Sequence, residues 1–377
     1  MKITRSLYDL IFKSKKSILL IGPRQSGKST LLKSLNPDVT INLASESTFV
    51  KISSDLDLFE SLTVGHKFIF VDEVQRIPGL LNTIQKIIDD EKKIFLLSGS
   101  SVRKLKRGQA NLLPGRVLSY NMAGLSIKEL GYKLNIEKAL SHGFLPEPYL
   151  EKNYALAEKI LDTYSHSYLK EEIQDEALTR NLQGFMRFLN SLAELSGTIL
   201  DFTKLATKSK VSRSSLTRFI EILEDTLIGQ RLEVFDLAKE ADIIKHPKFY
   251  FFDPGVLNGL LSNFNVSSDR KGNLLEHLIF AQLKNSAMAL DQKIEIYYFR
   301  TRSDVEVDFV IRWKKKWYAI EVKSGEVSKS DLAGLKIFRD YYPAVNRCFV
   351  VSLKEKKRTL DQITICGVTE LLNELEM

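Results

Sequence analysis

The stretch SILLIGPRQSGKSTLLKSL, residues 17–35, decides the fold. A short apolar run precedes a glycine-containing loop, and a helical run follows it and is ended by Pro37. The spacing Gly22-x-x-x-x-Gly27-Lys28-Ser29 is that of a P-loop, in which backbone N–H groups turn inward around phosphates. The stretch therefore predicts an α/β domain with a phosphate-binding loop between a strand and a helix.

The P-loop pattern assigns roles to its side chains. Lys28 is expected to reach the β and γ phosphates, and the Ser29 hydroxyl to ligate Mg²⁺. Farther on, the apolar run in HKFIFVDEVQ ends at Asp72 and Glu73. At a strand end Asp72 suits a Mg²⁺ ligand, and Glu73 suits orientation of an attacking water. The predicted ATP-binding residues are Gly22, Pro23, Arg24, Gln25, Ser26, Gly27, Lys28, Ser29, Thr30 and Asp72.

A third apolar strand is predicted in KIFLLSGSS, residues 93–101. It ends in Ser98 and Ser100, and either hydroxyl is a candidate sensor of the γ-phosphate. The alternative is that these serines cap the next helix.

The composition favours a folded protein with an anionic partner. Hydrophobic residues make up 44% of the 377 residues, a length that suggests two or three domains. The net charge of +8 favours nucleic acid as a partner, although a basic enzyme with solvated lysines is the alternative. The two cysteines, Cys348 and Cys366, form no CxxC pair, and no apolar run approaches the ~20 residues that span a bilayer. The expectation is a soluble, cytoplasmic protein without a membrane segment.

Residues 201–225 predict a DNA-binding unit in a mainly helical middle region. They contain a helix, a polar turn and a second helix that Ser212 caps, and residues 227–235 and 247–253 can pair as a β-wing. This order is typical of a winged helix-turn-helix. The alternative is a scaffold that bridges the flanking domains. The predicted DNA contacts, which lie away from the apolar face of the second helix, are Lys210, Arg213 and Arg218.

Two adjoining strands are predicted in DVEVDFVIRWKKKWYAIEVKSG, residues 304–325, around a tight basic loop. Alternation sends Glu306 and Asp308 to one face of the first strand, and Val305, Val307, Phe309 and Ile311 to the other. In the second strand Ala319, Glu321 and Lys323 share a face opposite Tyr318, Ile320 and Val322. A register that sets Asp308 beside Glu321 would place like charges across the ladder.

A divalent cation would resolve that repulsion. Asp308 and Glu321 are predicted to bind Mg²⁺ or Mn²⁺ with the Val322 carbonyl, and Glu276, on a preceding helix, is a further candidate ligand. Lys323 is expected to orient or deprotonate a water that attacks a phosphodiester, which is the logic of a D…ExK nuclease core. The alternative is a hairpin with a solvated charged face.

The order of motifs GPRQSGKST, FIFVDEVQ, LLSGSS, LLPGR, LSIKEL and GFLPEP resembles a prokaryotic AAA-type ATPase family. Members of that family carry a C-terminal domain related to restriction endonucleases. The resemblance implies that Arg116, in Pro114-Gly115-Arg116, approaches the nucleotide phosphates in cis or from a neighbouring subunit. Taken alone, this tripeptide predicts only a turn with a solvated arginine.

The sequence thus predicts an α/β chain with three modules: a P-loop AAA-type ATPase domain at residues 1–150, a helical and winged-helix region at 151–255, and a restriction-endonuclease-like α/β domain at 256–377. The predicted activity is ATP hydrolysis with engagement of DNA and nucleotide-controlled, metal-dependent cleavage. The alternative is a nucleotide-dependent switch or scaffold whose last domain only binds DNA or protein. A small-molecule kinase is disfavoured because Glu73 suits activation of water. A homo-oligomer is compatible with the proposed role of Arg116.

Overall fold

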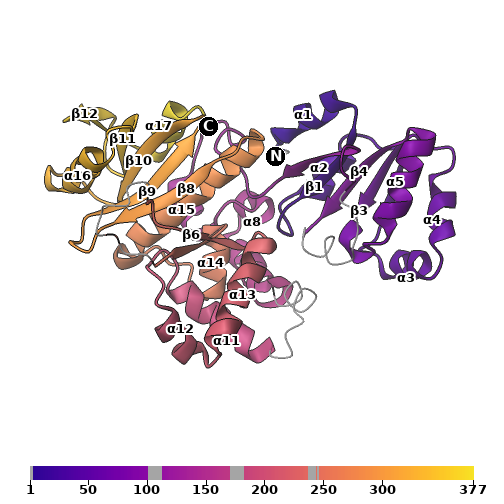
Figure 1. The fold of residues 1–377 in the computed structure, drawn as a ribbon, viewed down its shortest axis with the longest axis horizontal. Coiled ribbons are helices and arrows are strands. Elements are labelled where there is room, and N and C mark those ends of the chain that lie inside the picture. Colours follow the sequence, from indigo (N-terminus) through magenta and orange to yellow (C-terminus); the bar gives the residue numbers. More distant parts are fainter. Residues whose placement is uncertain (1–2, 101–112, 170–181, 237–242, 244–245) are drawn as a thin grey trace.

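The computed structural model describes residues 3–100, 113–169, 182–236, 243 and 246–377. Figure 1 shows three parts: an N-terminal lobe (residues 3–122) around one sheet, a C-terminal lobe (residues 268–377) around another, and a middle region (residues 136–260) that is mainly helical. None of the described helices combines the length and the apolar character needed to cross a membrane.

The N-terminal lobe is built on a parallel sheet with the strand order β2-β3-β4-β1-β5. The strands are β1 Ser17–Ile21, β2 Val39–Asn42, β3 Phe68–Asp72, β4 Ile94–Gly99 and β5 Val117–Asn121. Both faces of the sheet are apolar and covered, and all five residues of β1 are buried, as is usual for parallel strands. Because β1, β4 and β3 are parallel neighbours, their carboxyl ends meet at one edge of the sheet. The strands expected from the sequence in this lobe are confirmed.

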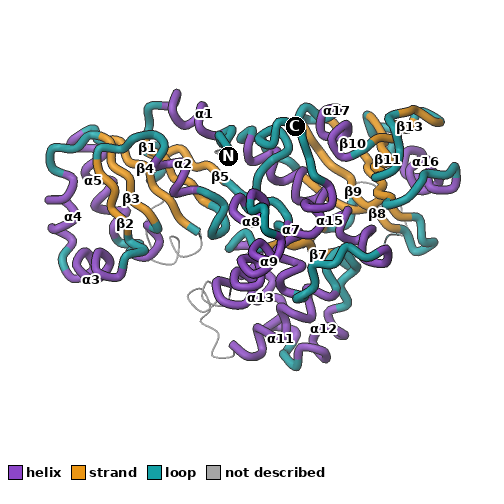
Figure 2. The backbone as a smooth tube through the Cα atoms, turned by 180° about the vertical axis from the view of Figure 1, so that it is seen from behind, coloured by secondary structure: helices purple, strands orange, loops and turns teal. Residues whose placement is uncertain are grey.

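Helices pack around this sheet, as the tube in Figure 2 shows from behind. They are α1 Leu7–Ser14, α2 Lys28–Lys33, α3 Glu46–Ser54, α4 Leu56–Thr63, the 3₁₀ turn η1 Val74–Arg76 and α5 Leu80–Glu91. The expected strand at 93–101 is described as far as Ser100, and Leu112 of the LLPGR motif also lies outside the described residues.

The middle region contains helices followed by a two-stranded ribbon. The helices are α7 Ile136–His142, α8 Pro146–Leu150, α9 Tyr154–Thr163, the π-helical turn η2 Tyr164–Tyr168, α11 Leu182–Glu194, α12 Phe202–Ser209, α13 Arg213–Asp225 and α14 Pro254–Leu260. Strands β6 Gly229–Leu232 and β7 Lys248–Phe251 pair antiparallel, and Ile199 forms an isolated bridge to Lys248. The two helices, the turn and the paired strands expected from residues 201–253 are therefore present.

The C-terminal lobe is a mixed sheet with the strand order β12-β13-β11-β10-β9-β8. Helix α15, Ser268–Ala289, packs on one face and α16, Ala333–Tyr341, on the other. The remaining elements are β8 Glu295–Arg300, β9 Glu306–Trp313, β10 Lys316–Lys323, η3 Ser330–Leu332, β11 Arg347–Ser352, β12 Arg358–Leu360, β13 Ile363–Cys366 and α17 Val368–Glu374.

The alternation predicted for β9 is wrong in its first half. Val307 and Val310 both pack in the cluster under α16, whereas Phe309 packs toward α15. The pairing with β8 shifts register between Tyr297 and Phe299, so that two residues of β9 oppose one residue of β8. Such a β-bulge moves every side chain on its far side to the opposite face. Asp308 lies in this bulge. Bulges commonly re-aim a side chain beside a functional site.

The β9–β10 hairpin is as tight as the sequence predicts. Its turn residues Lys314 and Lys315 have positive φ angles of 47° and 65°, which suits a two-residue type I′ turn. The antiparallel register ends with the pair Ile320 and Phe309, and its continuation sets Glu321 opposite Asp308. The faces expected for β10 are confirmed, since Tyr318, Ile320 and Val322 join the core under α15 and Ala319 joins the core under α16.

One buried apolar cluster joins the middle region to the C-terminal lobe, because it runs from Leu125 to Met377. The side-chain amide of Gln282, on α15, also holds the segment that follows β5. It accepts a hydrogen bond from the Ile127 N–H (2.8 Å) and donates one to the Leu125 carbonyl (3.0 Å). Helix α15 is therefore attached to the chain directly beyond the parallel sheet.

Candidate functional site: a P-loop and an acidic pocket

The P-loop leaves the carboxyl end of β1 and runs into the first turn of α2. A Cβ atom at Gly22 would lie 1.9 Å from the Met122 carbonyl oxygen, so only glycine permits this close passage. Gly27 precedes α2 with a φ angle of +92°, which also favours glycine. The backbone geometry therefore requires glycine at position 22 and favours it at position 27.

The lysine of the P-loop pattern, Lys28, is buried and held by the loop itself. The Lys28 ammonium donates to the carbonyls of Gly22 and Pro23, at 2.8 Å each. Ser26 closes the turn by donating its hydroxyl to the same Pro23 carbonyl at 2.8 Å. This geometry keeps a positive charge inside the curve of the loop, where phosphate oxygens bind in a P-loop.

Asp72 lies at the end of β3 and faces the P-loop helix. Its Oδ1 atom accepts hydrogen bonds from the Ser29 hydroxyl (2.8 Å) and from the Ser98 hydroxyl. A hydroxyl and a carboxylate at this separation fit the oxygen ligands that Mg²⁺ prefers. The structure therefore brings together Ser29, Asp72 and Ser98, and the Ser98 hydroxyl, near the end of β4, bonds to the carboxylate.

Glu73 is held beside this group by residues that sequence reasoning missed. Its backbone is left-handed (φ 60°, ψ 45°), and its N–H donates to the Ser98 hydroxyl at 3.1 Å. The Gln75 side-chain amide donates both to the Glu73 carboxylate and to the Ser100 hydroxyl, the latter at 3.0 Å. The sequence signal for Gln75 was only its place two residues after the acidic pair.

The other loop residues have a special backbone angle or line pockets. Gln25 has a positive φ of 60°, and Thr30 lines a pocket of about 520 Å³ with Tyr8 of α1. Pro23 and Arg24 line a narrow space that they share with the middle-region residues Tyr164, Leu169, Thr226 and Ile228. The P-loop and the middle region therefore border the same narrow space.

Arg5 is a second site residue that the sequence analysis missed. Its guanidinium is buried, forms an ion pair with Glu129 (3.0 Å) and donates to the carbonyls of Ser26, Ala123 and Gly124 at 2.8–3.0 Å. It ties the N-terminal segment to the P-loop and to the chain beyond β5.

Arg116 lies away from the P-loop of its own chain. It directly precedes β5, whose first residue Val117 pairs with Ser17 at the start of β1, whereas the P-loop follows the end of β1. Its guanidinium instead pairs with Asp89 at the end of α5, at 3.1 Å. The placement near the phosphates in cis is therefore not found, and a contribution from a neighbouring subunit stays a prediction.

The three predicted DNA contacts lie on the exposed side of the α12–α13 unit. Ser212 caps α13 by accepting the Ser215 N–H at 3.2 Å, so the helix starts where expected. The buried face of α13 contains Leu216, Phe219, Ile220 and Leu223, also as expected. Lys210, Arg213 and Arg218 are all exposed.

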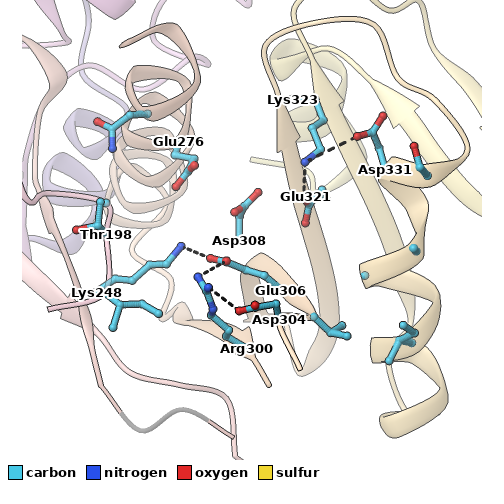
Figure 3. Close-up of a pocket in the computed structure, with 18 residues that line it drawn as sticks. Thr198, Lys248, Glu276, Arg300, Asp304, Glu306, Asp308, Glu321, Lys323 and Asp331 are labelled. Carbon is cyan, nitrogen blue, oxygen red and sulfur yellow. Dashed lines mark hydrogen bonds and ion pairs between the residues drawn. The ribbon is translucent and has the colours of Figure 1, made fainter. Parts of the chain in front are cut away.

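The four candidate residues of the C-terminal lobe converge on one pocket of about 780 Å³, shown in Figure 3. Glu276 comes from α15, Asp308 from β9, and Glu321 and Lys323 from β10. The Val322 N–H donates to Asp308 (2.8 Å), and Lys323 pairs with Glu321 (2.9 Å). Residues far apart in the sequence are thus assembled as predicted.

Burial and mutual repulsion raise the pKa values of these carboxyl groups. Desolvation, with the Asp308 charge second, raises the pKa of Glu276 to about 8 and that of Glu321 to about 8. Desolvation also raises the pKa of Asp308, against the effect of nearby Lys248. Glu321 Oε2 is buried without a hydrogen-bond partner among the described residues. The pocket therefore binds protons tightly and has a carboxylate oxygen with unused capacity.

Further charged residues of the pocket were not predicted. Lys248 of β7 pairs with Glu306 (2.7 Å), and Arg300 of β8 pairs with both Glu306 (2.8 Å) and Asp304 (2.9 Å). The Tyr250 hydroxyl donates to Glu276 at 2.8 Å. Lys248 and Tyr250 belong to the middle region, and no local pattern in the sequence links that strand to the acidic hairpin.

The chemistry of the pocket suits a hard divalent cation, because its free donors are carboxylate oxygens. Within the part of the chain that the structure describes, no three His, Cys, Asp or Glu side chains are already gathered closely enough to hold an ion. Binding would therefore require Glu276, Asp308 and Glu321 to close on the ion by rotamer changes.

Comparison with protein families supports an AAA-type domain in the N-terminal lobe. Residues 14–131 match the family model described as an AAA domain. Residues 133–267 and 271–371 match two further families, described as domains of unknown function (DUF8612 and DUF4143). Together with the parallel sheet and the P-loop, the first match defines an AAA-like P-loop domain followed by two other domains, and such a domain indicates nucleotide binding.

Relatives of similar length occur in bacteria. The chain is 25% identical to uncharacterized proteins of Mycobacterium bovis and Mycobacterium tuberculosis, over 94% of this chain and 82% of theirs. It is 21% identical to an uncharacterized protein of Haemophilus influenzae, over 78% of this chain and 79% of that one.

Among solved structures the likeness is weak. A Pif1 helicase of Candida albicans aligns with a TM-score of 0.24 and 14% identity, over 44% of this chain and 48% of that one. A signal-transduction (STAND) ATPase of Pyrococcus horikoshii aligns with a TM-score of 0.27 and 16% identity, over 77% and 47%. These scores are too low to support an argument, so the fold assignment rests on the strand order and the loop geometry.

Proposed function

We propose that the N-terminal lobe binds and hydrolyses ATP with Mg²⁺. The observation that carries the proposal is the contact of the Ser29 and Ser98 hydroxyls with Asp72 beside the buried Lys28 ammonium. Ser29 and Asp72 would hold Mg²⁺, which neutralises phosphate charge when it is bound. Lys28 would face the β and γ phosphates, and Glu73 would orient the attacking water while Gln75 holds its carboxylate.

Phosphate release from ATP by the full chain tests this proposal. Wild-type protein should hydrolyse ATP only with Mg²⁺ present, and Asp72→Ala should abolish turnover, because the substitution removes a ligand and the acceptor of both hydroxyls. A matched control is Asp57→Ala, which changes an exposed carboxylate of α4 in the same lobe. Hydrolysis by the Asp72 variant at the wild-type rate would contradict the assignment.

We further propose that the middle region and the C-terminal lobe engage DNA, and that the acidic pocket is a metal-dependent phosphodiesterase site. The convergence of Glu276, Asp308, Glu321 and Lys323 in one pocket supports it. Glu276, Asp308 and Glu321 would hold Mg²⁺ or Mn²⁺, which supplies Lewis-acid activation when it is bound. Lys323 would orient the water for attack, and its ion pair with Glu321 fixes its position.

The middle region is proposed to act as a winged helix. Three features support this reading: the order of α11, α12 and α13, the β6–β7 ribbon after them, and the bridge that Ile199 makes to β7 from the segment between α11 and α12. The exposed basic residues of α13 and the turn before it would contact DNA phosphates.

Incubation of plasmid DNA with the protein and Mn²⁺, with and without ATP, tests the proposed DNA binding and cleavage. Cleavage that Asp308→Ala abolishes would support the nuclease reading. Salt-sensitive retention of DNA without cleavage would instead favour the alternative, a nucleotide-dependent switch or scaffold whose last lobe only binds DNA or protein.

A further inference from the structure

A lysine from the middle region lies inside the acidic pocket of the C-terminal lobe. Lys248, on β7, is only 4% exposed, and its ammonium lies 2.7 Å from the Glu306 carboxylate. The ammonium also lies 5.3 Å from the centre of the Tyr298 ring. Figure 3 shows the lysine entering from the middle-region side, opposite the strand that carries Glu321 and Lys323.

The pocket has more acidic than basic groups. Its lining contains three cations, Lys248, Arg300 and Lys323, and six carboxylates, Glu276, Asp304, Glu306, Asp308, Glu321 and Asp331. Arg300 is bound by Asp304 and Glu306, and Lys323 by Glu321 and, at 4.0 Å, Asp331. Burial alone would lower the pKa of Lys248, but the charges of Glu276, Glu306 and Asp308 together hold this pKa above its ordinary value.

We infer that Lys248 is the resident counter-cation of the pocket and competes with a divalent ion for the carboxylates Glu276 and Asp308. This inference rests on the proposed metal function of the pocket. Two cations beside the same partly buried carboxylates repel each other, so the presence of one weakens the binding of the other. The metal affinity is therefore set by how deeply β7 inserts its lysine.

The lysine is delivered by an element that can transmit a signal. Strand β7 pairs along its length with β6, and Arg231 of β6 is fixed to Glu224 of α13 at 2.7 Å. Helix α13 and the turn before it carry the basic residues proposed to contact DNA. A shift of α13 upon binding would be passed through the ribbon to Lys248, so that substrate contact and metal binding would be linked.

The test measures Mn²⁺ binding to the full chain by calorimetry without nucleotide. Lys248→Met keeps the apolar stem and removes the charge, and Glu306 keeps its ion pair to Arg300. We expect roughly tenfold tighter Mn²⁺ binding in this variant. The matched control is Lys93→Met, which removes a buried lysine of the N-terminal lobe that pairs with Glu91 at 2.8 Å, and it should leave the affinity unchanged.

The possible outcomes distinguish the role of Lys248 from the existence of the metal site. Binding that Asp308→Ala abolishes but Lys248→Met leaves equal or weaker overturns the role of Lys248 and keeps the metal site. Absence of Mn²⁺ binding in wild-type and Lys248→Met protein overturns both.

If Lys248→Met does not fold, wild-type protein provides the second measurement. Since competition is reciprocal, saturating Mn²⁺ should raise acetylation of Lys248 by acetic anhydride several-fold, mapped by mass spectrometry. Unchanged labelling would overturn the inference.

Discussion

Replacing Glu276 by glutamine should remove much of the alkaline destabilisation of the metal-free protein. Glutamine keeps an oxygen that can accept the hydrogen bond from the Tyr250 hydroxyl, but it cannot ionise. The pKa of Glu276 is raised from 4.5 to about 8 by desolvation and by the Asp308 charge. The folded state therefore retains a proton that the unfolded chain releases, and stability falls as the pH rises toward 8.

The size of the effect follows from this shift. Each pH unit between the two pKa values costs about 1.4 kcal/mol for one retained proton. Between about pH 6 and pH 8 wild-type protein should therefore lose up to about 2 kcal/mol from Glu276, and the loss should level off above pH 8. Glu321, whose pKa is also about 8, adds a second contribution of the same sign. The protons that Glu276 and Glu321 retain therefore make metal-free wild-type protein more stable at pH 6 than at pH 8.

Urea denaturation of wild-type and Glu276→Gln protein across this pH range, without metal, measures the difference. Glu137→Gln, on the exposed side of α7, is the matched control and should follow the wild-type curve. Added Mn²⁺ should flatten the wild-type curve, because metal binding favours the deprotonated carboxylates. Identical pH dependence in wild-type and Glu276→Gln protein, with or without Mn²⁺, would refute the assignment of a buried, repelling carboxyl group to Glu276.

Three further outcomes are expected. Glu73→Gln should bind ATP as wild-type protein does while turnover falls by roughly 10²-fold, and Lys28→Ala should weaken binding itself, as fluorescent-nucleotide titration and phosphate release would show. Arg116→Ala should lower turnover only if subunits assemble, so mixing it with Lys28→Ala protein should restore activity, and failure to do so would exclude an action from the neighbouring subunit. Salt titration of DNA binding should lose about one unit of slope per lost contact in a variant with alanine at Lys210, Arg213 and Arg218, and an unchanged slope would favour the bridging scaffold.

Much of the fold follows from local patterns in the sequence. The runs SILLI and FIFVD are almost entirely apolar because both faces of a parallel sheet are covered; the first leads into the P-loop, and the second ends at Asp72. The tight hairpin after Trp313 and the N-cap at Ser212 were equally predictable, since both depend on neighbouring residues. The bulge in β9 was not, because it depends on pairing with β8 and leaves no mark in the alternation of the sequence.

The candidate sites were predicted only as far as they use strand ends and hairpins. Lys28, Asp72 and Ser98 follow from the edge at which parallel strands end, and Asp308 with Glu321 follows from hairpin register. The residues that the analysis missed reach their sites across long separations. Arg5 bonds to Gly124, and Lys248 to Glu306, through long-range packing that no local spacing encodes.

Helix α15 links the acidic pocket to the segment that follows the P-loop lobe, and this is a route by which the two sites could act on each other. Helix α15 carries Glu276 into the pocket and, six residues later, Gln282, which holds Leu125 and Ile127. That segment begins just after Met122, whose carbonyl lies against Gly22 of the P-loop. Because Gln282 is fully buried and bonded at both ends of its amide, a displacement of the segment would shift the helix rather than break the contact. The length of α15 between the two contacts is about 9 Å, short enough for a helix to move as a rigid unit.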